Sequence, residues 1–317
     1  MKRLSMRLAA GSGVTFGVDD LACAAATHLG CWADEGLDVS WTPVRGGVAA
    51  VQAVLDGHVD ASYGGLGPVL KFRSEGKPVR TIVSMARALA QNLVVQKRIT
   101  SPQQLRGVSW ALDGIGALSH HMARLIVQAL GIPESEIKWQ VAGPPPERIA
   151  QLLAMEVDVA LLRVEEALAL SLDPSTGLQT LLGFADLKEI VPVQPHGVLS
   201  VHSDYAVSHP EQLARMAKGM IIASRALNDD FEAFRAVYEH YVTVSVPLDQ
   251  VKLIWEQERR TQGFAVDGEV SRSHWAKQMK SFYELNPELP KVSFDDVILP
   301  NFVEEALVTL GRRAVSN

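Results

Sequence analysis

The tetrapeptide Val59-Asp60-Ala61-Ser62 recurs in closely similar form as Val157-Asp158-Val159-Ala160, 98 positions further along the chain. Both are interpreted as short strands that end their segments. Each tetrapeptide closes a longer segment, 7–64 or 107–163, in which the same structural signals follow one another in the same order. A repeat of this length predicts two similar folding units.

Each segment is interpreted as strand, helix, strand, helix, strand. An apolar run meets a glycine-containing turn, a helix follows and ends at a glycine, and an alternating strand leads through a Gly/Pro turn into a shorter helix. The matching features are Leu8–Gly11 and Val108–Gly114, Gly30 and Gly131, Leu37–Trp41 and Ile137–Val141, and Gly46-Gly47 and Gly143-Pro144. Strands that alternate with helices predict an α/β protein whose sheets are mostly parallel.

The remaining chain predicts how the two units are joined. Further strands are expected at 79–85, 93–96, 178–182 and 198–201, and helices at 210–228, 231–242, 247–260, 269–286 and 300–312. We expect lobe one to comprise residues 1–96 and 198–317 and lobe two to comprise 97–197. The chain then crosses between the lobes twice, near 93–96 and 198–201, and the helical tail packs on lobe one. A double crossing suits a hinge with a ligand site between the lobes.

Composition excludes several classes of protein. The chain of 317 residues has a net charge of −6 and no run of lysine and arginine, so we expect no binding to nucleic acid. No apolar stretch approaches the roughly 20 residues that span a bilayer. Lys2 and Arg3 resemble the start of a secretory signal, but Arg7 interrupts the apolar run that such a signal needs. We expect either a periplasmic protein whose signal peptide has been removed or a cytoplasmic one.

Cys23 and Cys31 are the only cysteines, and both fall in what is interpreted as one helix. Eight residues of helix separate them by about 12 Å, which is beyond the reach of a disulfide. We therefore expect both thiols to pack as small apolar groups in the core.

Ligands of parallel sheets bind beyond the carboxyl ends of the strands. In this sequence those ends are rich in glycine, which lets the backbone approach a ligand closely, and helices that begin there offer partial positive charge to an anion. The candidate ligand-binding residues are Ser12, Thr15, Arg45, Gly46, Gly65, Leu66, Arg87, Ser119, His120, Arg163 and His196.

Some of these residues have two interpretations. Arg45 and Arg163 follow equivalent strands, and each either binds a carboxylate or forms a structural ion pair. Ser119 either caps a helix or binds a ligand oxygen. We expect six of the candidates to surround one cavity between the lobes: Arg45, Gly65, Ser119, His120, Arg163 and His196.

Three acidic residues near these strand ends also enter the argument. Asp113 would repel an anion at the start of the adjacent helix, which keeps open a ligand with an amine or a ring nitrogen. Glu165 and Glu166 are expected on a solvated helical turn and not as an acid–base pair.

Sequence motifs of common enzymes are absent. The chain has no Gly-x-Ser-x-Gly, His-Glu-x-x-His, Cys-x-x-Cys or phosphate-binding loop. His120 and His121 are adjacent, so on a helix they diverge by about 100° and make a poor metal pair. We expect no catalytic residue, no metal and no cofactor.

The run Leu29–Val39, with Gly30-Cys31-Trp32 and Glu35-Gly36-Leu37-Asp38-Val39, resembles a signature of nitrate-, sulfonate- and taurine-type substrate-binding proteins. Residues 59–65 and 99–107 resemble the next two landmarks of that family, and 275–306 is similar to its closing helices. The superfamily also includes thiamin-pyrimidine synthase-like proteins. The resemblance implies a periplasmic-binding-protein fold of type II over nearly the whole chain.

What the resemblance implies for function is the substrate-binding component of an ABC importer, a monomer that works with a permease and an ATPase. The ligand would be a small organic molecule, and both an aromatic or heterocyclic ring and an anionic group are left open. Leu118 and His120 replace the small polar residues usual in sulfonate binders, which favours a ring. The alternative is a cytoplasmic enzyme on the same fold, such as an aromatic-acid decarboxylase or a pyrimidine-precursor synthase, although the synthases' cysteine-rich motif is absent.

Overall fold

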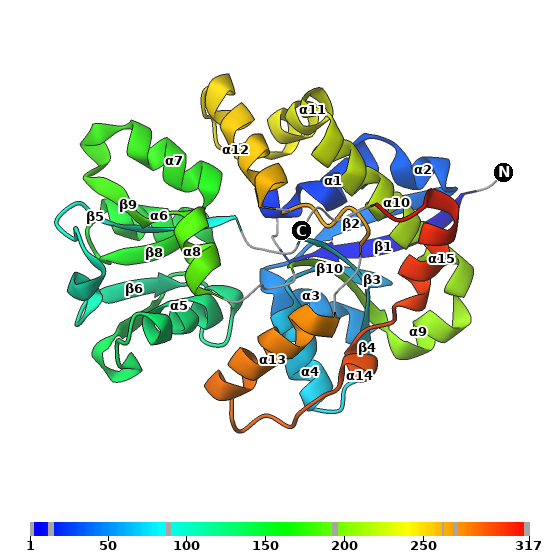
Figure 1. The fold of residues 1–317 in the computed structure, drawn as a ribbon. Coiled ribbons are helices and arrows are strands. Elements are labelled where there is room, and N and C mark those ends of the chain that lie inside the picture. Colours follow the sequence, from blue (N-terminus) through cyan, green and yellow to red (C-terminus); the bar gives the residue numbers. More distant parts are fainter. Residues whose placement is uncertain are drawn as a thin grey trace.

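Two lobes lie side by side in the computed structural model, each built around its own sheet (Figure 1). The structure describes residues 3–11, 16–86, 90–191, 196–261, 263–268 and 272–313, without the side chains of Ala86, His196 and His274. Lobe one contains the sheet ordered β2-β1-β3-β10-β4, and lobe two the sheet ordered β7-β6-β8-β5-β9. Within the described residues, none of the helices combines the length and the apolar character that crossing a membrane requires.

The strands of lobe one are β1 (Leu4–Ala10), β2 (Leu37–Pro43), β3 (Ala61–Gly64), β4 (Val79–Ala86) and β10 (His196–His202). Those of lobe two are β5 (Gln91–Gln96), β6 (Ser109–Leu112), β7 (Lys138–Val141), β8 (Val159–Arg163) and β9 (Leu178–Leu182). The helices before the tail are α1 (Leu21–His28), α2 (Cys31–Asp34), α3 (Gly46–Leu55), α4 (Leu66–Ser74), α5 (Leu118–Ala129), α6 (Pro145–Leu153), α7 (Val164–Leu172) and α8 (Phe184–Ile190). The tail contains α9 (Ser203–Ser208), α10 (Pro210–Asp229), α11 (Phe231–Tyr241), α12 (Leu248–Arg260), α13 (Arg272–Leu285), α14 (Phe294–Val297) and α15 (Asn301–Leu310).

The pairing of the strands confirms the repeat. β1 pairs in parallel with β2 and β3, and β6 pairs in parallel with β7 and β8. Asp60 and Asp158, the repeated aspartates, precede the third strand of each copy, and each accepts a hydrogen bond from the first strand of its own copy, from the N–H of Arg7 (2.7 Å) or Ser109 (2.8 Å). The repeated aspartate therefore makes the same hydrogen bond in each lobe, and this bond fixes the register of the first and third strands of that copy.

One predicted boundary differs from the observed pairing. β5 was expected to end lobe one, but it runs antiparallel between β8 and β9 and belongs wholly to the second sheet. β10 likewise inserts antiparallel between β3 and β4 of the first sheet. The chain thus changes lobe between β4 and β5. All six residues of β5 are buried within lobe two, where the strand pairs with β8 and β9. The division into residues 1–96 with 198–317 and 97–197 remains a proposal, with its first boundary moved before residue 91.

Helices cover both faces of each sheet. In lobe one, α1, α10 and α11 enclose a core that contains Met6, Leu8 and Trp32, while α4, α13 and α14 cover the opposite face. In lobe two, α5 and α8 pack on one face and α6 and α7 on the other. Both sheets are therefore the middle layer of a three-layer lobe, and only the strand ends remain for a shared site.

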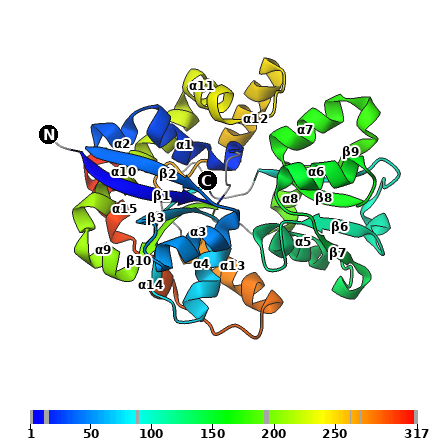
Figure 2. The ribbon, with the colours of Figure 1, turned by 180° about the vertical axis from the view of Figure 1, so that it is seen from behind.

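The tail mostly packs on lobe one, as expected, but two of its helices also reach lobe two. α12 contacts α7, and α13 contacts α5 (Figure 2). Phe282 of α13 lies 5.7 Å from the ring of His121, and Leu285 is buried in the core of lobe two. The expectation of a tail on lobe one alone is incomplete, because α13 spans the boundary.

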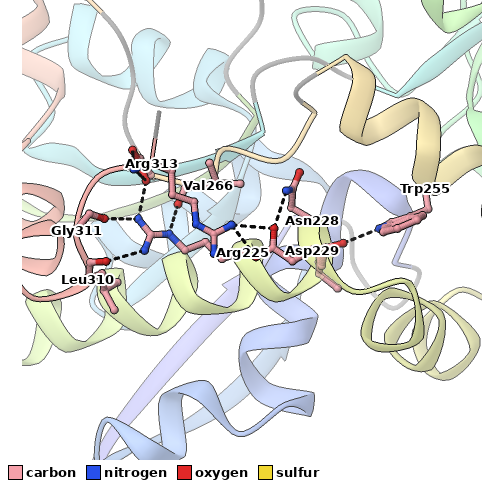
Figure 3. Close-up of polar contacts among 10 residues, drawn as sticks. Arg225, Asn228, Asp229, Trp255, Val266, Leu310, Gly311 and Arg313 are labelled. Carbon is pink, nitrogen blue, oxygen red and sulfur yellow. Dashed lines mark hydrogen bonds and ion pairs between the residues drawn. The ribbon is translucent and has the colours of Figure 1, made fainter. Parts of the chain in front are cut away.

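Arg225 of α10 ties the end of the tail to lobe one (Figure 3). Its guanidinium donates to the carbonyls of Val266 (2.8 Å), Leu310 (3.1 Å) and Gly311 (2.6 Å), and it pairs with Asp267 (2.7 Å). A planar guanidinium with five donors can satisfy several carbonyls at once, so a single buried side chain anchors the chain end.

The two cysteines are buried and free, as predicted, but they do not share a helix. The chain breaks between α1 and α2 at Gly30, whose φ of 75° is left-handed. Burial raises the pKa of Cys31 to about 11, so both thiols behave as apolar groups.

Candidate functional site

Four helices begin at the facing edges of the lobes and carry no side-chain cap. They are α3 and α4 in lobe one and α5 and α6 in lobe two, and their N-cap residues are Arg45, Gly65, Ala117 and Pro144. In the tail, α11 is capped by Asp230 and α14 by Ser293, whereas α10, α12 and α15 also lack a side-chain cap. The first turns of α3, α4 and α5 thus keep backbone N–H groups for water or a ligand, whereas α6 begins with three prolines that have no N–H to donate.

Arg163, at the end of β8, connects the two lobes. It forms an ion pair with Asp20 of lobe one (3.1 Å) and lies 3.8 Å from Glu166. Gly17 makes room for it, because a Cβ at that position would lie 2.2 Å from Arg163 Cδ. Burial alone would lower the pKa of Arg163, but Asp20 and Glu166 raise it above its usual range. Of the two interpretations of Arg163, the structural ion pair is the one found.

Arg45 makes the second ion pair across the boundary. Its guanidinium lies 3.1 Å from Glu147 of α6, and the two side chains are 83% and 43% exposed. Exposed pairs contribute little to stability, so this contact leaves Arg45 available to a ligand.

Glu165 and Glu166 are buried, so the prediction of a solvated turn was wrong. Only 1% of Glu165 and 6% of Glu166 are exposed. The N–H of Val18 donates to Glu165 Oε1 (3.3 Å), and Glu166 Oε2 accepts from the N–H of Arg163 (2.9 Å). The first turn of α7 is held against lobe one, which excludes water from both carboxyl groups.

The pKa values of two acids at this place are raised. Burial and the neighbouring Glu166 raise the pKa of Glu165 to about 8, against the opposing effect of Arg163. Burial raises the pKa of Glu258 on α12 well above its usual range, with further contributions from Asp19 and Glu165. Asp19, Glu165 and Glu258 therefore lie close enough to interact, although they come from three separate elements.

Ser119 and His120 serve the turn between β6 and α5. Ser119 Oγ accepts a hydrogen bond from the N–H of Asp113 (2.8 Å), and the N-cap is Ala117, so Ser119 is not the cap. His120 Nδ1 accepts from the N–H of Gly116 (3.0 Å), and its ring lies edge-on to Trp139. His120 is 8% exposed, and burial lowers its pKa. The ring packs within lobe two, its Nε2 has no hydrogen-bond partner among the described residues, and a contact of His120 with the ligand stays a prediction.

Asp113 does not carry a free charge at the start of α5. Arg148, which is 4% exposed, lies 3.1 Å from it and also donates to the carbonyl of Leu161. The expected repulsion of an anion at this corner is thereby neutralised.

The lobe-one candidates differ from one another. Gly46 has a φ of 85°, and its N–H donates to the carbonyl of Gly11 (2.9 Å), so its backbone requires glycine. Gly65 lines a narrow void with Gly47 and Tyr63. Leu66 is 1% exposed and belongs to the core beneath α4, which leaves it no contact surface for a ligand.

Four candidates cannot be compared with the structure. Ser12, Thr15 and Arg87 lie outside the described residues, as does the side chain of His196. The backbone of His196 begins β10 opposite Ala86. The expectation that six candidates surround one cavity remains a prediction: Arg45 and Arg163 both reach across the boundary, whereas Ser119 and His120 face into lobe two.

Sequence reasoning missed Asp19 and Asp20, which face Arg163, and Glu258, which faces Glu165. Asp19 and Asp20 follow the glycine turn after β1, a position where the same reasoning did look for site residues. Glu258 gave no signal, because it lies in a helix of otherwise ordinary amphipathic pattern and reaches the boundary only through the packing of α12.

The described residues contain no group of three or more His, Cys, Asp and Glu side chains that could hold a metal ion. A cavity of about 380 Å³ is formed by lobe one alone, between β4, α14 and α15, and its apolar wall includes Ile82, Phe294 and Val303. It is separate from the strand ends described above.

The fold is that of periplasmic binding proteins. The alkanesulfonate-binding protein SsuA from Xanthomonas axonopodis pv. citri, bound to MOPS, superposes with a TM-score of 0.75 at 16% identity, covering 95% of this chain and 99% of that one. The ligand-binding component of an ABC-type import system from Staphylococcus aureus, with zinc bound, gives 0.75 at 10% identity (96% and 99%). The periplasmic nitrate-binding protein NrtA from Synechocystis PCC 6803 gives 0.72 at 13% identity (98% and 90%).

The family is shown by the sequence itself. A profile of the family described as NMT1/THI5 like matches residues 21–224, which is more than half of the chain, and the protein belongs to this family. The sequence matches no curated protein. The resemblance to sulfonate- and nitrate-type binding proteins is thus confirmed as a statement about fold and family.

Proposed function

We propose that this protein is the substrate-binding component of an ABC importer and that its lobes close on one small organic molecule. The observation that carries the proposal is the pair of contacts across the boundary, Arg163 with Asp20 and Arg45 with Glu147. Both join strand ends or helix starts of opposite lobes, at the edge where a parallel sheet binds its ligand. The structural similarity to ligand-binding components of import systems supports the same function.

The chemistry of the boundary supports a polar ligand held largely by backbone groups. The uncapped first turns of α3, α4 and α5 would donate N–H groups to ligand oxygens. The sequence argument for an aromatic ring at the start of α5 is weakened at one of its two residues, because His120 packs against Trp139. We therefore keep the ligand class at a small organic molecule with at least one oxygen acceptor group.

The proposal includes partners and a location. A binding component delivers its ligand to a permease that an ATPase drives, and it works outside the inner membrane. We propose that this protein is a periplasmic monomer with these partners, in keeping with structural relatives that are periplasmic binding proteins.

The test begins with the ligand. Native mass spectrometry of the purified protein should show one bound small molecule per chain, and small-angle scattering should show a more compact particle with this molecule than after its removal. Adding the loaded protein to vesicles that contain the permease and ATPase should stimulate ATP hydrolysis. A particle that binds the molecule and converts it chemically would contradict the proposal.

One observation favours an enzyme on the same fold. A buried carboxyl whose pKa is raised to about 8, as for Glu165, is suited to proton transfer near neutral pH. The carboxyl-rich surroundings disfavour the decarboxylation of an aromatic acid, since the substrate's own carboxylate would add to Asp19, Glu165 and Glu258. Incubation of the purified protein with the co-purified molecule, followed by mass spectrometry of both, separates binding from turnover.

A further inference from the structure

We infer that the ligand's end at the hinge carries a protonated nitrogen, an amine or an amidine, and that Glu165 with Glu258 forms the subsite that binds it. This inference rests on the proposed function, because it assigns one end of the molecule on which the lobes close.

Glu165 has one oxygen that is bonded and one that is not. Oε1 accepts a hydrogen bond from the N–H of Val18, which belongs to lobe one (3.3 Å). Oε2 is buried and has no hydrogen-bond partner in the described part of the protein. A buried acceptor without a donor is costly, and such atoms are rare in folded proteins. In its ionised form Glu165 would therefore need an N–H donor at Oε2, and no described residue supplies one.

Two amide oxygens at the same end of lobe two share this property. Gln91 Oε1 and Asn92 Oδ1, at the start of β5, are buried and lack a partner within the described residues. Gln91 lies directly opposite Arg163 in the pairing of β5 with β8, and Asn92 lies opposite Leu162. Successive residues of a strand point to opposite faces of the sheet, so at most one of these two amides shares a face with the start of α7. Glu165 Oε2 remains the acceptor that an N–H donor of the ligand would reach.

The charge around Glu165 has the same sign from nearly every direction. Carboxyl groups come from the turn before α1 (Asp19 and Asp20), from α7 itself (Glu166) and from α12 (Glu258). The described cations that face them are Arg163 of β8, Arg148 of α6 and Lys188 of α8, and Tyr238 of α11 is a neutral titratable group nearby. A cationic ligand group would offset this excess of negative charge, whereas an anion would increase it.

Proton exchange gives the subsite a measurable signature. Because burial raises the pKa of Glu165 to about 8, this carboxyl is largely protonated at pH 7 when no ligand is bound. A cation placed against it favours the carboxylate form, so binding near neutral pH should release a proton.

The experiment uses benzamidine and benzoate, which have the same phenyl ring. Benzamidine is a cation that donates hydrogen bonds, and benzoate is an anion that accepts them. We expect isothermal titration calorimetry at pH 7 to show millimolar or tighter binding of benzamidine, at least tenfold weaker binding of benzoate, and a heat that varies with the ionisation enthalpy of the buffer. Glu165→Gln should weaken benzamidine binding at least tenfold and abolish the buffer dependence. Glu239→Gln, which alters an exposed acid of α11, should leave both unchanged.

Several results would overturn the inference. One is no binding of benzamidine at millimolar concentration, and another is binding of benzoate that is as tight or tighter. The third is a Glu165→Gln variant that is folded by circular dichroism and binds benzamidine as tightly as the wild type. The proposed function fails differently. If benzoate binds and compacts the lobes, the importer proposal stands and the cationic subsite falls. If benzamidine binds through Glu165 but the co-purified molecule is turned over, the subsite stands and the importer proposal falls.

Discussion

At the scale of single residues, the charges buried between the lobes are the most sensitive positions. Arg163→Met removes the guanidinium that faces Asp20 and Glu166 but keeps most of its apolar volume. Carboxylates left without a partner in a buried place typically cost about 3–5 kcal/mol. We expect urea unfolding at pH 7 to show a loss of stability on this scale.

The matched control is Arg45→Met, which breaks the exposed pair with Glu147. Exposed ion pairs contribute about 0–1 kcal/mol, so the variant should unfold close to the wild type. Equal losses for the two arginines would show that burial does not distinguish the pairs.

Glu165 should make stability depend on pH. Its pKa is 4.5 in the unfolded chain and about 8 in the folded one, so between these values the folded state holds a proton that the unfolded state has lost. Stability therefore falls as pH rises from about 4.5 to 8, with a slope of up to about 1.4 kcal/mol per pH unit from this group. Glu165→Gln should flatten the urea stability profile over this range and unfold at higher urea than the wild type at pH 8.

The same residues show how far sequence could predict the site. Arg163 was found because it ends a strand of the repeat, and its position can be counted along the chain. That it pairs with Asp20 depends on how closely the lobes approach, which no local pattern encodes. Glu165 and Glu166 were misassigned for the same reason: two adjacent acids at a helix start are typical of solvent exposure, and only lobe one, packed against them, buries them.

At the scale of elements, periodicity predicted the long helices well because each buries one continuous face. α10, α11 and α12 lie within about two residues of their expected ends. Strand β5 was predicted, but it was assigned to the sheet of lobe one and belongs to that of lobe two. A strand buried on both faces shows no alternation that would indicate which sheet it joins. The end of the first helix at Gly30 was predicted correctly, and the interpretation of Cys23 and Cys31 as members of one helix was wrong because it ignored that end.

A close contact between two helices gives a test at this scale. Gly219 lies within α10 against Trp32 of α2, and a Cβ there would lie 2.4 Å from the indole Cδ1. Alanine normally stabilises a helix by up to about 1 kcal/mol relative to glycine, but overpacking costs about 1–3 kcal/mol. We expect Gly219→Ala to lower the free energy of unfolding.

Gly67→Ala in α4 is the control, since a Cβ at that position meets nothing within 4 Å. This variant should be as stable as the wild type or slightly more stable, in the same urea measurement. A stabilised Gly219→Ala variant would mean that α2 and α10 can separate at little cost.

At the scale of the whole molecule, α13 links the two lobes mechanically. Trp275, Met279 and Phe282 bury their side chains in lobe one, whereas Leu285, one turn further, is buried in the core of lobe two. Arg124 of α5 adds a hydrogen bond to Asn286, directly after the helix (3.5 Å). When the lobes separate, α13 must give up one of these two attachments, and the one to lobe two is the smaller, because it consists of Leu285, the ring of Phe282 against His121 and the hydrogen bond of Asn286.

Leu285→Ala should therefore shift the molecule toward an open form. Truncating a buried leucine costs about 2–5 kcal/mol where the site cannot collapse, and a cost that falls on the closed form alone reduces its population about tenfold for every 1.4 kcal/mol. We expect small-angle scattering to give a larger radius of gyration for this variant without ligand, and ligand affinity to fall in proportion to the loss of the closed form. Leu253→Ala on α12, whose side chain is 51% exposed, should change neither quantity. If Leu285→Ala unfolds more easily but keeps the wild-type radius and affinity, α13 stays attached to both lobes during closure, and the hinge must act without it.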